Sequence, residues 1–154
     1  YIMQLVFTKK TGKYDHLTII RPNCEIEQID CPKQGIIPHD MVHFGVESIL
    51  HKRGFISRIH AGEEATFQMQ AEAESDGVER LVEVFQADGW SGWQTPAGEM
   101  LDLYQVTCNA RLCPPLALSV DDVDMVRLEL LRLSALWNAV PTHESLTLNF
   151  ELQA

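Results

Sequence analysis

Alternating apolar and polar residues at both ends of the chain constrain the fold more than any other feature. The last segment places apolar side chains at every second position, at Leu146, Leu148, Phe150 and Leu152. The first segment does the same at Met3, Leu5 and Phe7. Because successive side chains of a strand point to opposite faces, both segments are predicted to be strands with one buried face.

Two further strands are predicted directly after the first. The sequence KKTGKY at 9–14 is typical of a turn, and Leu17 and Ile19 then alternate again. The turn sequence RPN at 21–23 precedes a weaker strand through Ile26. Three strands with one solvated face would leave unpaired edges, so the C-terminal strand is expected to join the same sheet.

The middle of the chain changes to a helical pattern, with apolar residues recurring every three or four positions. Four helices are predicted, from Pro38 to about His51, within 63–88, over 98–112, and from Ser119 to about Val140. No repeat or linker divides the chain, so residues 1–154 are predicted to form a single globular domain. Its fold class is α+β. A small antiparallel sheet of three N-terminal strands plus the C-terminal strand carries a four-helix insertion packed on one face.

The last predicted helix has two features of its own. Ser119 and Asp122 form a capping-box sequence at its start. Leu128, Leu131 and Leu133 make it apolar on more than one face. This helix is therefore predicted to be buried in the centre of the domain or shared with a second subunit.

Charge and cysteine usage exclude several classes of protein. The net charge of -10 disfavours nucleic acid as a partner, because phosphate binding needs clustered Lys and Arg. No window approaches the roughly 18 consecutive apolar residues of a membrane span, and no charged and then apolar leader opens the chain. The four cysteines are spaced C-x6-C and C-x4-C, unlike a zinc ribbon or a disulfide scaffold. We expect a soluble, cytoplasmic protein with free thiols and with no nucleic-acid or membrane partner.

The first predicted helix carries two histidines one turn apart. His39 and His43 differ by only about 40° around the helix axis, so their imidazoles point the same way. They lie along the edge of the apolar stripe that contains Val46 and Leu50. This spacing allows two neutral imidazoles to bind one divalent metal ion, with zinc the first candidate.

The sequence HDMVH at 39–43 resembles the His-Glu-x-x-His helix of zinc metalloproteases, over five residues. Asp40 stands where that family has glutamate. The resemblance implies that Asp40 is the general base, although its side chain is one methylene shorter and reaches less far toward a metal-bound water. Alternatively, Asp40 orients a ligand from behind.

A catalytic zinc usually has three protein ligands, and the sequence offers several candidates for the third. Glu47 completes a His-x3-His-x3-Glu series. In an unbroken helix it lies about 12 Å along the axis from His39, so it can join only if the chain unwinds near Gly45. Four alternatives follow later in the chain, at His60, Glu63, Glu64 and His143.

A glycine-bordered loop, DGWSGWQTP at 88–96, contains Trp90 and Trp93. Exposed tryptophans in a loop suit a binding surface, because they bring a large apolar area with little entropy to lose. The same rings can instead cover the core above the preceding helix, which is the favoured interpretation.

Two functions from different classes remain, because standard nucleotide, nicotinamide and serine-hydrolase motifs are absent from the sequence. The first is a non-catalytic binding or accessory module that contacts a protein partner or forms a homo-oligomer. The second is a metal-binding, zinc-type hydrolase-like domain that uses the helix at 39–43. The first is favoured because a five-residue motif often arises by chance.

Overall fold

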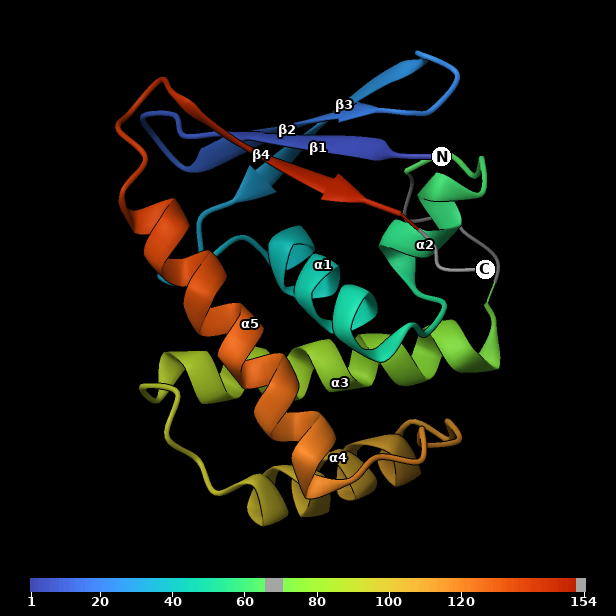
Figure 1. Cartoon of the computed structure of the whole chain (residues 1–154). Helices are drawn as coiled ribbons and strands as arrows, with labels where there is room; N and C mark the ends of the chain where they lie inside the picture. Colours follow the sequence, from blue (N-terminus) through green and yellow to red (C-terminus); the bar gives the residue numbers. More distant parts are fainter. Residues whose placement is uncertain (66–70, 152–154) are drawn as a thin grey trace.

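The computed structural model of the chain describes residues 1–65 and 71–151. Its strands form one antiparallel sheet of three N-terminal strands and the C-terminal strand, as predicted, and their order is β3-β2-β1-β4 (Figure 1). They are β1 (Met3–Thr8), β2 (Tyr14–Ile20), β3 (Ile26–Pro32) and β4 (Ser145–Phe150). Leu5 of β1 is level with Ile19 on one side and Leu148 on the other. The predicted strand residue Leu152 lies outside the described residues.

The helical region confirms the prediction of a helical insertion and adds one short helix. The helices are α1 (His39–Leu50), α2 (Phe55–His60), α3 (Ala73–Trp90), α4 (Ala97–Ala110) and α5 (Val120–Asn138). Of the part predicted as the second helix, residues 66–70 lie outside the described residues. Helix α2 was not predicted, because six residues are too few to show a helical period.

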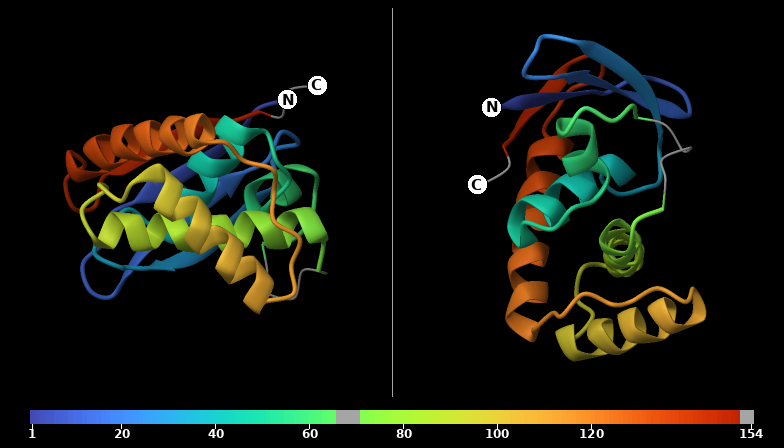
Figure 2. Two further views of the ribbon diagram at one scale, coloured as in Figure 1. Left: turned by 90° about the horizontal axis from the view of Figure 1, so that it is seen from below. Right: turned by 90° about the vertical axis from the view of Figure 1, so that its right-hand side faces the viewer.

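All the helices lie on one side of the sheet (Figures 1 and 2). The inward residues of β1, Met3, Leu5 and Phe7, are fully buried beneath that side. Helix α1 is next to the sheet, α3 lies beyond α1, and α4 is outermost (Figure 1). Because α1 contacts α2, α3, α5 and β3, every residue from Met41 to Glu47 is buried.

Helix α5 begins with the predicted capping box. The Ser119 hydroxyl accepts a hydrogen bond from the Asp122 backbone N–H, and the Asp122 carboxylate accepts one from Ser119 N–H. Leu133 is buried, but Leu128 is 70% exposed. The prediction that α5 is buried in the centre of the domain is therefore wrong, because the helix lies along one side of the bundle.

No helix of the described residues is long and apolar enough to span a bilayer.

Gly45 lets α1 and α5 pack closely. A Cβ atom at this position would lie 2.6 Å from Leu130 Cδ2 and 3.4 Å from Leu133 Cδ1, and both leucines are fully buried. We expect Gly45→Ala to lower the free energy of unfolding by about 1 kcal/mol, because overpacking costs about 1–3 kcal/mol and better helix propensity returns up to about 1 kcal/mol. Urea unfolding measures this difference. Gly98→Ala is the control, because its added Cβ meets nothing within 4 Å. Equal stability of Gly45→Ala and wild type would contradict the prediction.

Candidate metal centre

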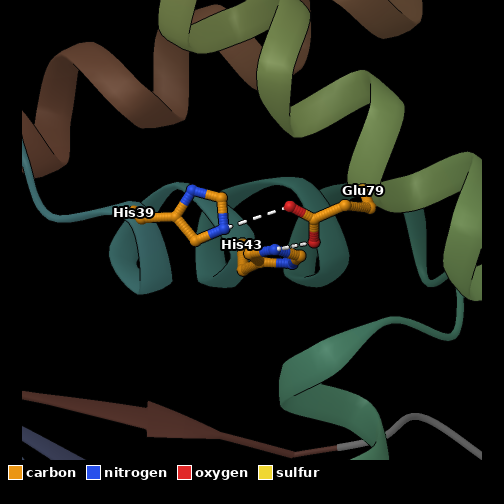
Figure 3. Close-up of side chains that lie close together, drawn as sticks. All are labelled: His39, His43 and Glu79. Atoms are coloured by element: carbon orange, nitrogen blue, oxygen red, sulfur yellow. Dashed lines mark hydrogen bonds and ion pairs between the residues drawn. The ribbon is translucent and has the colours of Figure 1, made fainter. Parts of the chain in front are cut away.

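Two histidines of α1 and one glutamate of α3 point toward one another (Figure 3). The Nε2 atom of His39 lies 3.2 Å from Glu79 Oε1, and the Nε2 atom of His43 lies 2.7 Å from Glu79 Oε2. The two imidazole centroids are 4.8 Å apart. One ligand atom from each residue lies within 4.8 Å of the other two, so the three side chains can hold one metal ion. The structure therefore brings together the predicted pair and a third donor that was not predicted.

The second nitrogen of each imidazole has its own partner. His39 Nδ1 is 2.9 Å from Gln86 Oε1, and His43 Nδ1 is 3.1 Å from Glu47 Oε2. If each Nδ1–H donates to these acceptors, both Nε2 lone pairs are directed toward Glu79. Proteins commonly orient metal-binding histidines in this way, with a carboxylate or carbonyl oxygen behind the ring.

Burial and charge distinguish the members of the group. The side chain of His43 is 2% exposed, whereas those of His39 and Glu79 are 38% and 33% exposed. Burial lowers the pKa of His43, but hydrogen bonds to Glu47 and Glu79 outweigh burial and raise that pKa from 6.5 to about 10. Burial raises the pKa of Glu79, but hydrogen bonds from His39 and His43 outweigh it and hold the pKa well below its usual value. Without a metal ion, a proton on His43 therefore bridges the two helices.

Glu47 lies behind His43 and does not reach His39, because α1 continues without a break through Gly45. Its carboxylate accepts hydrogen bonds from the backbone N–H groups of Gly54, Ile56 and Ser57. The Ser57 hydroxyl donates a further bond of 2.7 Å. Glu47 thus ties the start of α2 to α1 and fixes the orientation of the His43 ring.

The four alternative third ligands have other contacts. Glu63 forms ion pairs with Arg53 and Arg58. The His60 Nε2 atom is 2.7 Å from the backbone oxygen of Tyr1. Glu64 and His143 are exposed. In the part of the chain that the structure describes, the metal-ligand group with His39 and His43 is completed by Glu79 and does not include these residues.

Asp40 faces β3 and lies at a pocket beside His39. The Cys31 thiol is within 3.8 Å of its Oδ2 atom, and burial raises the pKa of the Asp40 carboxyl. The pocket has a volume of about 310 Å³ and is lined by Cys31, Pro32, Gln34, His39, Asp40 and Gln86. Gln86 and His39 belong both to this pocket and to the candidate metal centre, so a small molecule in the pocket would lie next to a bound ion.

Glu79 could have been suspected from the sequence of α3. The apolar face of this helix includes Val78, Val82 and Phe85, and Glu79 lies at its edge. Gln86 follows seven residues later, which places it on the same side of the helix. Like the two histidines of α1, which are four residues apart, these two polar residues lie on one side of their helix at the edge of an apolar face.

The two tryptophans predicted to lie in a loop differ in position and exposure. Helix α3 continues through Trp90, so only Trp93 lies in the loop. Trp90 is exposed, and its Nε1–H donates to the backbone oxygen of Gln34, 2.7 Å away. Trp93 is half-buried and packs against the hydrophobic core. A Cβ atom on Gly89 would lie 2.7 Å from the Trp93 ring, so this glycine makes room for it. Trp93 therefore covers the core, whereas Trp90 presents an apolar surface near the pocket that Gln34 lines.

Comparisons of the chain with protein-family models, with curated proteins and with solved structures give no match. Function must therefore be inferred from the geometry and chemistry of the candidate metal centre. Two imidazoles and one carboxylate form a donor set found in catalytic zinc sites and in non-haem iron sites.

Proposed function

We propose that the protein binds a divalent transition-metal ion, of the zinc type, through His39, His43 and Glu79. The observation that carries this proposal is the convergence of both Nε2 atoms on one carboxylate while each Nδ1 atom has an oxygen acceptor behind it. An ion pair alone needs one imidazole, and it needs no second ring at 4.8 Å. Three protein ligands leave a fourth position open, as in catalytic zinc sites.

Hydrolysis is the activity that we propose for this centre. A metal ion bound here would lower the pKa of its water and so supply a nucleophile at neutral pH. His39 and Glu79 are partly exposed, so a substrate can approach from the side of the adjoining pocket. Asp40 lines that pocket next to His39. We assign to Asp40 the role of accepting a hydrogen bond from the substrate or from the attacking water.

We also propose that the protein works in a reducing compartment such as the cytoplasm, because its four cysteines are free.

A non-catalytic binding module is the second candidate function, and the exposed apolar side of α5 supports it. The two candidates are compatible, because the candidate metal centre is formed by α1 and α3.

The proposed metal site is tested by elemental mass spectrometry and by calorimetric titration of zinc into metal-free protein. We expect about one equivalent of metal in wild type and none in His43→Ala or Glu79→Gln. Glu83→Gln is the matched control, because Glu83 lies one turn further along α3 and pairs with Arg80. Zinc uptake by Glu79→Gln equal to that of wild type, or no uptake by either, would contradict the proposal.

A further inference from the structure

Helix α5 presents an apolar surface that is left exposed by the other helices and strands of residues 1–65 and 71–151. In Figure 2 it runs along the outer edge of the molecule, with α1 and α4 on its inner side. We define the α5 face as its exposed residues Val120, Asp121, Asp124, Met125, Leu128, Leu131, Arg132, Ala135, Leu136 and Asn138. At 100° per residue, these positions all lie within about 80° of Leu128 around the helix axis.

The α5 face also borders a groove. The groove has a volume of about 620 Å³ and is lined by Ile49, Met125, Leu128, Glu129, Leu131 and Arg132. Ile49 comes from α1, so the groove runs between the two helices. Exposed and continuous apolar surface of this kind, bordered by charged side chains, marks an interaction site.

The order of charged residues along the α5 face favours a second copy of this chain as the molecule that binds there. Consider two copies of α5 that pack antiparallel, with the two-fold axis at Leu128. A residue that precedes Leu128 in one copy is then level with the residue that follows Leu128 by the same number of positions in the other copy. Asp124 is then level with Arg132 of the second copy, and Arg132 with Asp124. Leu128 meets Leu128 at the axis, and Met125 and Leu131 pack against it.

We infer that the protein forms a two-fold symmetric dimer through the α5 face, with a second copy of this chain as the partner. Each dimer contains the Asp124–Arg132 contact twice, because a two-fold interface repeats every contact. Arg132 also contacts Glu129 on its own helix, so one guanidinium can hold an acidic group of each copy. The apolar centre and charged rim match the usual composition of protein interfaces.

Sedimentation equilibrium of the whole chain tests the dimer, with circular dichroism as a check on folding. Wild type is expected to reach twice the monomer mass as its concentration rises. Leu128→Asp places two like charges on the axis and is expected to raise the dissociation constant by at least about a hundredfold. A wild type that stays monomeric at every concentration, or a dimer that survives Leu128→Asp, overturns the inference.

Charge exchange tests the two-fold arrangement. Asp124→Arg and Arg132→Asp each bring like charges together, so each variant alone is expected to be monomeric. A mixture of the two restores both contacts and is expected to form a heterodimer, and the double variant is expected to dimerise by itself. Both positions are exposed, so each change is expected to leave the chain folded, which circular dichroism checks. A mixture that stays monomeric overturns the arrangement.

Glu79→Gln is expected to dimerise like wild type, which separates the dimer from the metal proposal.

Discussion

Replacing Glu47 by alanine is expected to lower the free energy of unfolding by about 3–5 kcal/mol, because it leaves a buried charged partner without compensation. Glu47 is 1% exposed, and its carboxylate accepts hydrogen bonds from three backbone N–H groups at the start of α2. It also accepts from the imidazole of His43. Without it these donors are buried and unpaired, and each unpaired group costs about 1–3 kcal/mol.

Urea unfolding of metal-free protein measures this loss without a contribution from bound metal. Glu64→Ala is the control, because Glu64 is exposed and such surface changes usually stay within about 0.5 kcal/mol. Glu47→Gln is expected to fall between alanine and wild type, since the amide keeps one oxygen acceptor, whereas its NH2 group cannot accept from the backbone N–H groups. We further expect faster amide exchange across α2 in Glu47→Ala than in wild type. A loss below about 1 kcal/mol would show that these hydrogen bonds are not needed.

Metal-free protein is expected to become less stable as the pH rises from about 7 to about 10. The pKa of His43 is raised from 6.5 to about 10 in the folded protein by the carboxylates on either side of its ring. Because the pKa of His43 is higher in the folded than in the unfolded protein, protonated His43 stabilises the fold. This stabilisation is complete below pH 6.5, the pKa in the unfolded chain, and it is lost as the pH rises to about 10, the pKa in the folded protein. Comparison of wild type with His43→Gln over this range isolates the effect from other titrating groups.

Zinc is expected to change this pH dependence. In the proposed site a metal ion would take the place of the proton at His43 Nε2, and its binding would strengthen as that proton becomes easier to displace. At a thousandfold excess over its dissociation constant, zinc adds about 4 kcal/mol to the free energy of unfolding. The gain on adding zinc should therefore grow as the pH rises above neutrality, and it should vanish in His43→Gln. Equal stabilisation of wild type and His43→Gln by zinc would contradict the site.

The fold was predictable because its signals are local. Strand alternation at Met3–Phe7 and at Leu146–Phe150, and the capping box at Ser119, each depend on residues within one turn or one strand. Helix α2 escaped prediction because six residues are too few to show a helical period. Its start is held by hydrogen bonds to Glu47 of the preceding helix, a contact that no sequence pattern shows. Local signals also placed His39 and His43 on one side of α1.

Glu79, the third residue of the candidate metal centre, could not be paired with the histidines from local sequence signals. Glu79 lies 36 residues after His43, and only the packing of α3 on α1 brings the two together. Glu47 was the sequence candidate because it continues the His-x3-His spacing, but helical geometry separates it from His39 by about 12 Å. Spacing along one helix therefore identified the pair of histidines, and the arrangement of two helices identified the residue that completes the group.

The pairing of β1 with β4 has a consequence for the order of folding. Met3 is level with Phe150, so this pairing joins positions at nearly opposite ends of the described chain. Contacts of such high contact order form slowly, because a long loop must close first. During synthesis α1 and α3 can pack together around His39, His43 and Glu79 while β1 still has an unpaired edge. Until β4 arrives, that edge is open to other strands, and an unpaired edge of this kind favours aggregation of a nascent chain.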